Sequence, residues 1–455
     1  MNELINGTSK YIKPNRENKF FEGVSLVFLF SLFVMPQYFG IPLPLFDLSI
    51  LRITIIMLVI LILSDTQRKY DFVNVITGSK CTKVIIPYLA VVTYTMILRV
   101  DINAFLNPFI EIFSMYLLIY VIKNVFGVEK TIRYILIFMY ILTILGLFEY
   151  VIKRSPFSYF ETIKGLYTGR FIRSGSYRIM GPCIHSLGYG LLLIAVLPLA
   201  CLDFKENTID ILHRPVLFFL TVANIIFTGS RSTLSMLFVE LILLFILSDK
   251  KYKKKFILLG LVIFAVLALF LTLFHNSGLA RYILLQLTSI IDEIFGTQYS
   301  VVYGANLSAL GSSSNYRDQL KYIFNVEWLN PIIGIGRKRS FSALINGSYV
   351  QSVDDFYIAE FIRYAYPGMI AYIFFIIYFL VNMLRDAIKK HSALCKILFA
   401  GCLCYIINLK WVDSLQTLKY LYIMLALYMG IDWKKFASSQ KEKAEKSKHS
   451  KYIRR

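Results

Sequence analysis

The chain has 455 residues, of which 57% are hydrophobic and 17% are charged. Its apolar residues form repeated uninterrupted runs, a pattern that excludes a soluble globular protein. The formal net charge is +21. In a soluble protein this charge would suggest nucleic acid binding, but between apolar runs the position of each charge matters more than the sum. We therefore expect no nucleic acid partner.

Runs of about 18 or more apolar residues can cross the hydrocarbon core of a membrane as helices, because a helix satisfies its own backbone in lipid. Such runs recur along the chain and predict an all-α polytopic membrane protein with about 12 transmembrane helices. We expect the spans at 21–40, 47–64, 84–100, 105–122, 132–152, 184–203, 213–229, 232–248, 256–274, 365–384, 393–409 and 417–432.

Basic residues indicate which side of the membrane each loop occupies. Several precede the first apolar run, and no small-residue cleavage site follows it, so this run is interpreted as a retained anchor. An even number of spans puts both termini on one side, and a cytoplasmic position for both satisfies the positive-inside rule. The inner segments then carry Arg68, Lys69, Lys80, Lys83, Lys123, Lys130, Arg133, the lysine cluster at 250–255, Arg385, Lys389 and Lys390.

Two predicted outer segments, 153–183 and 275–364, are longer than the other loops. A loop as long as the second is usually either functional or disordered. Amphipathic pieces at 279–295 and 316–326, separated by a Gly/Ser stretch at 307–315, predict a folded outer cap with short helices. The chain thus divides into a cytoplasmic N-terminus (1–20), spans one to nine (21–274), a large, partly helical extracytoplasmic loop between spans 9 and 10 (275–364), spans ten to twelve (365–432) and a basic cytoplasmic tail (433–455).

Arginines on the predicted outer side are the first candidate site residues, although each could instead lie on a solvated loop surface or contact lipid headgroups. Arg231 is more informative, because TGSRS at 228–232 leaves almost no room for a loop, and a cation at the bilayer surface is costly unless paired or snorkelled. A Gly-Ser turn before a helix frees N–H groups for an anion, and arginine presents a donor fork suited to phosphate. We expect a pyrophosphate site formed by Arg178, Arg231, Arg317, Arg173 and Arg337.

Carboxylates near these arginines are the second group of candidates. Asp354 and Asp355 precede an apolar run and could act as a general base or hold an arginine; the alternative is an N-cap of the next helix. Glu240 lies about two and a half turns into the span after Arg231, where a carboxylate usually faces the bundle interior. Six scattered cysteines show no metal-ligand spacing, so we expect no metal. We assign supporting roles to Glu240, His185 and Tyr357.

In four stretches the chain resembles the Wzy-type polysaccharide polymerase and O-antigen ligase superfamily, bacterial membrane glycosyltransferases that act on polyprenyl-pyrophosphate-linked glycans. The order and sidedness of these stretches, over roughly 165–375, are similar to the family pattern. Ala365 stands where the family commonly has a glycine. The stretches are RIMGP at 178–182 followed by His185 and Gly188, TGSRS at 228–232, YR at 316–317 with NPIIGIG at 330–336, and DDFY at 354–357 through Pro367 and Gly368.

The resemblance implies a GT-C-like fold in the bacterial cytoplasmic membrane and polymerisation of undecaprenyl-pyrophosphate-linked oligosaccharide repeat units on its outer face, as in O-antigen or capsule synthesis. Arg178, Arg231 and Arg317 would hold the donor pyrophosphate, and Asp354 or Asp355 would orient or deprotonate the acceptor hydroxyl. The reaction would be metal-independent and need no cofactor. The implied partners are the lipid-linked glycan donor and acceptor, membrane lipids and a regulator of chain length.

Two alternative functions stay open. Ligases of this superfamily typically place a His-Asn pair near the position of Asp354 and Asp355, where an acidic residue is more like the polymerases. A lipid-linked oligosaccharide flippase would also need phosphate-binding arginines. Such a transporter is expected to have similar halves and short loops, and the long segment 275–364 argues against it.

Overall fold

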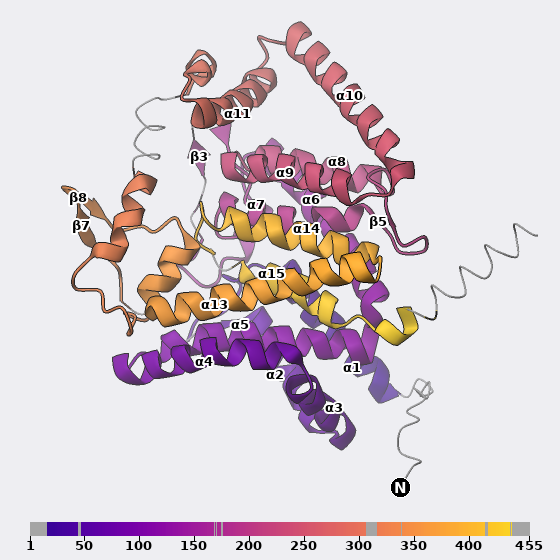
Figure 1. Ribbon diagram of the computed structural model, residues 1–455, viewed down its shortest axis with the longest axis vertical. Coiled ribbons are helices and arrows are strands. Elements are labelled where there is room, and N and C mark those ends of the chain that lie inside the picture. Colours follow the sequence, from indigo (N-terminus) through magenta and orange to yellow (C-terminus); the bar gives the residue numbers. More distant parts are fainter. Residues whose placement is uncertain are drawn as a thin grey trace, which may run out of the picture.

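The computed structural model describes residues 16–43, 47–167, 169, 171–173, 176–305, 316–337, 339–414, 417–436 and 438. Most of the expected cytoplasmic tail, the first part of the expected N-terminus and the Gly/Ser stretch at 307–315 lie outside these residues. The described part of the chain is mostly helical, and it contains four short hairpins in the segments that connect the helices (Figure 1).

The longer helices are α1 (Arg16–Phe33), α2 (Ile50–Leu63), α3 (Thr66–Thr77), α4 (Lys80–Arg99), α5 (Ile102–Val121), α6 (Gly127–Ile152), α7 (Ser186–Ala200), α8 (Pro215–Phe227), α9 (Arg231–Leu247), α10 (Lys250–Leu273), α11 (Gly278–Phe295), α13 (Phe356–Lys389), α14 (Ala393–Asn408) and α15 (Leu418–Met429). A π-helical turn, η1 (Ile122–Phe126), joins α5 to α6, and residues 316–320 are also helical. The 3₁₀ turns are η2 (Pro156–Phe160), η3 (Tyr299–Tyr303) and η4 (Lys321–Asn325).

Each hairpin pairs two consecutive strands in antiparallel register. The pairs are β1 (Gly40–Ile41) with β2 (Leu48–Ser49), β3 (Ile172–Arg173) with β4 (Ser176–Tyr177), β5 (Leu202–Asp203) with β6 (Thr208–Ile209), and β7 (Ala343–Ile345) with β8 (Ser348–Val350).

Four described helical segments are long and apolar enough to cross a membrane: α4, the continuous stretch Ile102–Ile152, α10 and α13. The pair α2 and α3, bent by 115°, adds a fifth if it counts as one broken span. The helices α7, α8, α14 and α15 are apolar but shorter. Every expected span coincides with a helix, so the structure supports a helical membrane protein, while the count of about 12 crossings stays a prediction.

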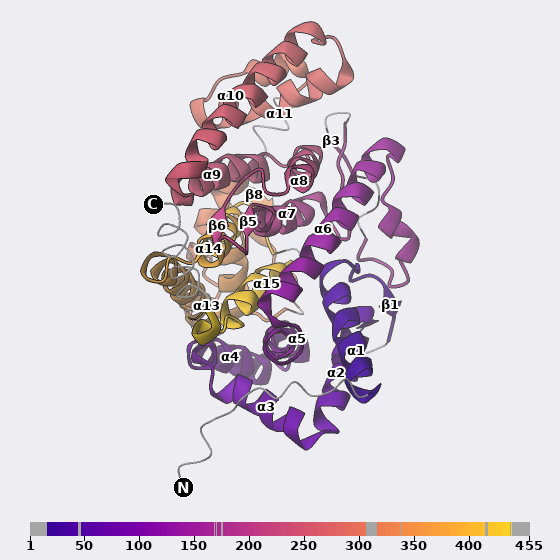
Figure 2. The ribbon, with the colours of Figure 1, turned by 90° about the vertical axis from the view of Figure 1, so that its right-hand side faces the viewer.

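The helices pack around α7 and α15, which are buried along almost their whole length. Helix α7 contacts α14, α8 and α9, and α15 contacts α5 and α14 (Figure 2). Helix α10 differs, because it has no buried residue and stands away from the other helices in Figure 1. An apolar helix that is exposed on all sides requires a lipid environment or another protein surface.

The connecting segments gather at opposite ends of the bundle. In Figure 1 the β7–β8 hairpin lies at the left end, whereas β5 lies at the right end. At the β5–β6 hairpin, Asn207 donates from Nδ2 to the His391 carbonyl and accepts from the Ala393 N–H, so this hairpin is attached to the turn between α13 and α14.

Two elements differ from the expected boundaries. Helix α3 occupies a segment that was expected to be an inner loop. Asp65 caps its N-terminus, and among its residues only Phe72 and Val75 are buried. Its sequence contains no long apolar run, which is why hydropathy did not predict it. Helix α13 begins at Phe356, before the expected start at 365, and changes direction at Ala365. The long outer segment therefore ends on a helical turn that continues into a membrane-length helix.

The kink at Ala365 generates the first testable prediction. Ala365 is buried and has φ 56° and ψ −167°, a conformation that costs a residue other than glycine about 1–3 kcal/mol. Its methyl group contributes about 1 kcal/mol by burial. We expect Ala365→Gly to raise the free energy of unfolding by about 1 kcal/mol, because the relieved strain exceeds the lost burial. Denaturant unfolding in detergent measures this change, and a glycine variant less stable than the parent would contradict it.

Candidate functional site

The turn between α8 and α9 is the centre of the candidate site. Gly229 has φ 58°, in the left-handed region that favours glycine. Ser230 then caps α9, because its hydroxyl accepts from the Thr233 N–H at 3.3 Å. A Cβ at Gly229 would lie 3.0 Å from Nε of Arg178. Glycine is thus needed here for the backbone conformation and for the approach of an arginine.

Arg178 lies against this turn although it is far from it in sequence. Its Nε donates to the Thr228 carbonyl at 2.6 Å, and its guanidinium lies 4.9 Å from the centre of the Phe171 ring. The next residue, Ile179, donates its N–H to the Phe227 carbonyl at 3.1 Å. Arg178 is only 3% exposed. The predicted proximity of Arg178 to the turn that carries Arg231 is therefore present in the structure.

Glu149, near the end of α6, holds the segment that carries Arg178. Its Oε1 accepts from the Tyr177 hydroxyl at 2.9 Å and from the Met180 N–H at 2.8 Å, and its Oε2 accepts from the Gly181 N–H at 3.0 Å. The carboxylate is fully buried. A buried carboxylate with several donors fixes the backbone around it, so Glu149 positions Arg178.

Arg231 and Arg317 share one carboxylate. Nη1 of Arg231 lies 3.3 Å from Oε2 of Glu293, and Nη1 of Arg317 lies 3.8 Å from Oε1 of the same residue. Glu293 belongs to α11, which also contacts the end of α8, because the Tyr282 hydroxyl donates to the Ile226 carbonyl at 2.9 Å. Helix α11 thereby brings the long outer segment to the turn.

Two of the arginines at this turn share one carboxylate. Glu293 bridges Arg231 and Arg317, while Arg178 donates to the Thr228 carbonyl of the same turn. Glu293 is 39% exposed, and both of its ion pairs are longer than a good hydrogen bond, so solvent weakens them. Nε of Arg317 is buried without a hydrogen-bond partner among the described residues. This arrangement can accept a further anion with several oxygens.

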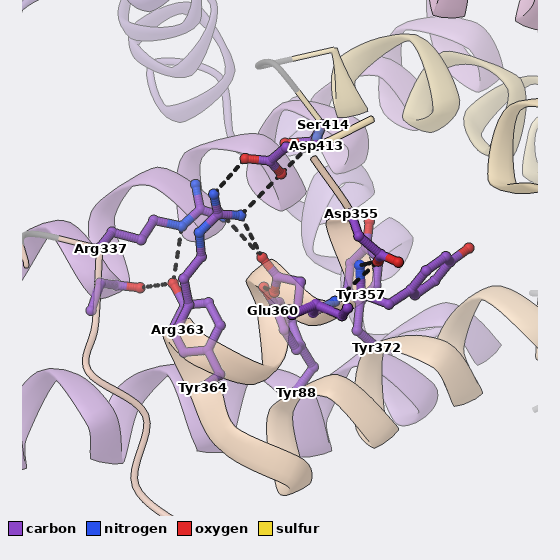
Figure 3. Close-up of polar contacts among 12 residues, drawn as sticks. Tyr88, Arg337, Asp355, Tyr357, Glu360, Arg363, Tyr364, Tyr372, Asp413 and Ser414 are labelled. Atoms are coloured by element: carbon purple, nitrogen blue, oxygen red, sulfur yellow. Dashed lines mark hydrogen bonds and ion pairs between the residues drawn. The ribbon is translucent and has the colours of Figure 1, made fainter. Parts of the chain in front are cut away.

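A second cluster of charges lies where the long outer segment meets α13 (Figure 3). Arg363 pairs with Asp413 at 2.6 Å and 3.3 Å, and with Glu360 at 3.2 Å. Glu360 also lies 3.8 Å from Nη2 of Arg337 and accepts from the Tyr88 hydroxyl at 2.9 Å. Because both arginines of the second cluster already pair with carboxylates, we interpret this cluster as a structural network and not as a site for a further anion.

The second cluster fastens the NPIIGIG segment to the bundle. The Gly336 N–H donates to the Arg363 carbonyl at 3.1 Å, and Nε of Arg99 donates to the Gly334 carbonyl at 2.8 Å. A Cβ at Gly334 would lie 2.1 Å from the Arg363 carbonyl oxygen, so the two backbones can approach only at a glycine. Arg337, which was expected at the pyrophosphate, pairs with Glu360 in this network.

Asp355 is the N-cap of α13, which was the alternative considered for this pair. Its Oδ1 accepts from the N–H groups of Tyr357 and Ile358, at 2.9 Å and 3.2 Å. Burial raises the pKa of Asp355 above its ordinary value, although these two N–H groups oppose the shift. Asp354 accepts from the Ser352 hydroxyl at 3.1 Å.

Helix α14 links the start of α13 to the turn at Arg231. The Phe356 N–H donates to the Leu409 carbonyl at 3.0 Å, and Nδ2 of Asn408 donates to the Thr233 hydroxyl at 3.3 Å. Thr233 in turn donates to the Ser230 hydroxyl at 2.8 Å. Asp355 and the arginine turn are thus connected through the C-terminal end of α14.

The remaining predicted residues have local structural contacts. His185 caps α7 by accepting from the Leu187 N–H at 3.1 Å, and the Tyr357 hydroxyl donates to the Ile406 carbonyl at 2.8 Å. Glu240 is fully buried, and within the described part of the chain neither of its oxygens has a hydrogen-bond partner. The side chain of Arg173 lies outside the described residues.

Sequence reasoning did not identify Glu293, Glu360 or Asp413. Each pairs with an arginine that is distant in sequence or on another element, so only the packing of the helices reveals the pair. The amphipathic pattern of 279–295 correctly predicted a helix there, but not which of its acidic residues faces the turn.

No protein-family model and no curated protein sequence matches this chain.

A side chain at Gly229 would disturb both the backbone of the turn and the approach of Arg178. We expect Gly229→Ala to lower the free energy of unfolding by about 1–2 kcal/mol, because alanine disfavours a positive φ and its Cβ approaches Arg178. Gly260→Ala is the matched control, since a Cβ at Gly260 of α10 would meet no atom within 4 Å. Unfolding of both variants in the same detergent measures the difference. Equal stabilities would show that the turn tolerates a side chain.

Proposed function

We propose that this protein is a membrane glycosyltransferase that polymerises polyprenyl-pyrophosphate-linked oligosaccharide repeat units. The observation that carries the proposal is the gathering of Arg178, Arg231 and Arg317 around one turn, with a single solvent-exposed carboxylate between two of them. Three arginine forks suit the several oxygens of a pyrophosphate. The resemblance of TGSRS at 228–232 to the polymerase and ligase superfamily supports the same chemistry.

In the proposed reaction the arginines act on the leaving group. The bond between the anomeric carbon of the donor glycan and its phosphate oxygen breaks, and a bond forms between that carbon and the acceptor hydroxyl oxygen. Negative charge develops on the departing polyprenyl pyrophosphate, where Arg178, Arg231 and Arg317 stabilise it. Pyrophosphate leaves as an anion and needs no general acid. The proton of the acceptor hydroxyl passes to a carboxylate, for which we propose Asp355.

Asp355 is favoured over Asp354 by its position. It is partly buried and connected to the arginine turn through Leu409 and Asn408, and burial raises its pKa toward the range in which a carboxylate is an effective base. Only its Oδ1 is engaged as a helix cap. Oδ2 would accept the proton.

In the proposed site, the carboxylate of Glu293 lies where the pyrophosphate would bind between Arg231 and Arg317. Its two oxygens bridge Arg231 and Arg317 as two phosphate oxygens would. Because the carboxylate is partly exposed and its ion pairs are long, a more highly charged pyrophosphate would displace it at little cost. Glu293 would then keep the two arginines oriented between reaction cycles.

The membrane arrangement in the proposal has twelve crossings, a GT-C-like architecture and both termini in the cytoplasm of a bacterium. The arginine turn would face the outer side, because α11 and Arg317 of the long outer segment contact it through Glu293. The donor and acceptor glycans, membrane lipids and a regulator of chain length would be the partners. Twelve spans fit the observation that each expected apolar run contains a helix.

Substitution of Arg231 tests the proposed function. We expect Arg231→Ala to lower the rate of polymerisation at least about a hundredfold, the loss typical for removal of an electrostatic group at a developing charge. Arg231→Lys should recover only part of the rate, because an ammonium lacks the planar fork. The readout is glycan chain length in membranes of a deletion strain that carries each variant.

Arg281→Ala is the matched control, because Arg281 is an exposed arginine on α11. Polymer of normal length from a correctly inserted Arg231→Ala variant would contradict the proposal. The deletion strain separates the alternatives: a polymerase defect leaves single repeat units facing outward, a ligase defect leaves finished polymer on its lipid, and a flippase defect leaves repeat units on the inner leaflet.

Asp355 gives a prediction about pH. We expect Asp355→Asn to lower the rate by about 10²–10⁴, because asparagine removes the base, while stability is kept, because asparagine is an equally good N-cap. Asp354→Asn is the control and should retain activity. In the parent protein the rate should fall as the pH drops through the raised pKa of Asp355, since only the ionised carboxylate accepts a proton. A full rate in Asp355→Asn would exclude this residue as the base.

A further inference from the structure

Helix α10 (Lys250–Leu273) combines a run of lysines with an apolar helix that has no buried residue. Its sequence begins KKYKKK at 250–255 and is apolar from Phe256 onward. With 24 residues it is about 36 Å long, enough to cross a hydrocarbon core of about 30 Å. It stands apart from the bundle in Figure 1. In a membrane, acyl chains would therefore surround its apolar part, and its charged first turns would lie among the lipid headgroups.

One side of these first turns faces the end of α9. The Phe256 ring lies 5.8 Å from the Phe245 ring, and Nζ of Lys253 lies 5.3 Å from the centre of the same ring. At about 100° per residue, the other four lysines fall within an arc of about 140° on the opposite side of the helix. We call this group the lysine surface; its members are Lys250, Lys251, Lys254 and Lys255.

The lysine surface is exposed, and one of its members has a carboxylate partner. Nζ of Lys255 lies 3.3 Å from Oδ2 of Asp210. Within the described ranges, no carboxylate lies at ion-pair distance from Lys250, Lys251 or Lys254. Lysines four residues apart repel each other on a helix, and cations at its start oppose its dipole. These lysines therefore do not stabilise α10 by themselves, and an added negative charge would relieve their repulsion.

A tyrosine lies beside these ammonium groups. Nζ of Lys251 and Nζ of Lys255 lie 5.3 Å and 5.2 Å from the centre of the Tyr252 ring. Tyrosine is typical of the headgroup level of a membrane, because its ring is apolar and its hydroxyl is polar. The first turns of α10 thus offer cations for phosphate oxygens directly next to an apolar helix for acyl chains.

Asp210 fixes where the lysine surface lies on the protein. Its N–H donates to the Cys201 carbonyl at 2.9 Å, and its Oδ1 accepts from the Leu212 N–H at 3.0 Å, so Oδ2 is the oxygen that meets Lys255. Asp210 directly follows the β5–β6 hairpin, which Asn207 attaches to the turn between α13 and α14. We predict that this end of the bundle is cytoplasmic, and acidic lipids of the cytoplasmic leaflet attract a basic cluster next to a transmembrane helix.

We propose that the lysine surface binds the headgroups of acidic phospholipids, whose acyl chains lie along the apolar part of α10. Charge complementarity selects this occupant, because a zwitterionic headgroup carries its own cation, which the lysines repel. The inference does not depend on the proposed glycosyltransferase function. Each lysine close to an acidic lipid surface strengthens binding about fivefold, so the loss of three should weaken it at least about tenfold.

Native mass spectrometry of the full chain in detergent micelles tests the proposal, with dioleoyl phosphatidylglycerol and dioleoyl phosphatidylcholine as probes. We expect the parent protein to bind phosphatidylglycerol at least about tenfold more tightly than phosphatidylcholine. The triple variant Lys250→Gln, Lys251→Gln and Lys254→Gln should lose this preference. The corresponding triple arginine variant should keep it, because the charge is retained. The single variant Lys254→Gln should lose about fivefold in affinity, which keeps the test decisive if the triple variant is unstable.

A matched control separates a specific surface from general attraction to a basic protein. The triple variant Lys69→Gln, Lys80→Gln and Lys83→Gln removes the same charge from three exposed lysines on the same predicted side. We expect it to bind phosphatidylglycerol as the parent protein does.

Four outcomes would overturn the proposal. The first is equal affinity of the parent protein for the two lipids, and the second is unchanged phosphatidylglycerol affinity in the α10 glutamine variants. The third is an equal loss in the control variant, which would assign the preference to the net charge of the whole inner side. The fourth is a dimer of the parent protein that disappears in the triple glutamine variant while lipid binding is unchanged, which would assign the surface to a second copy of the chain.

Discussion

The candidate site depends on one close approach, that of the Arg178 side chain to the turn between α8 and α9. The turn leaves space for a guanidinium only because Gly229 has no Cβ, and the Thr228 carbonyl accepts a hydrogen bond from the arginine that fills this space. Glu149 then fixes the backbone after Arg178 with three hydrogen bonds. With these contacts in place, Arg231 starts α9 directly after a turn against which Arg178 is already held.

The two arginine clusters differ in how exposed their carboxylates are: the Glu293 side chain is 39% exposed, whereas that of Glu360 is 1% exposed. In the second cluster Glu360 and Asp413 receive Arg363, and the network joins the NPIIGIG segment to the helices. At the turn, Glu293 bridges Arg231 and Arg317, and it is accessible to water. A paired buried network is expected to hold structure, while arginines paired with an exposed carboxylate can exchange it for a ligand. From their carboxylates we therefore infer a structural role for the cluster around Arg363 and a binding role for the turn at Arg231.

Hydropathy predicted where the helices lie, because an apolar run long enough to cross a membrane has few other stable conformations. It missed α3, which buries only Phe72 and Val75, and it placed the start of α13 too late, because the first turn of that helix precedes the long apolar run. The sequence also pointed to Arg178, Arg231 and Arg317 as one group. It could not reveal that Arg337 pairs with Glu360 or that Glu293 bridges two arginines, since both contacts depend on how distant segments pack. Asp355 caps α13 through Oδ1, which leaves Oδ2 outside the cap and is compatible with its proposed role as a base.

The central claim is that the turn at Arg231 binds the pyrophosphate of a lipid-linked glycan. The most direct measurement is an experimental structure of the protein in a lipid bilayer with bound undecaprenyl pyrophosphate. We expect phosphate density in contact with Arg178, Arg231 and Arg317, with the carboxylate of Glu293 displaced from its bridging position. Phosphate density elsewhere on the protein, with Glu293 still bridging Arg231 and Arg317, would contradict it.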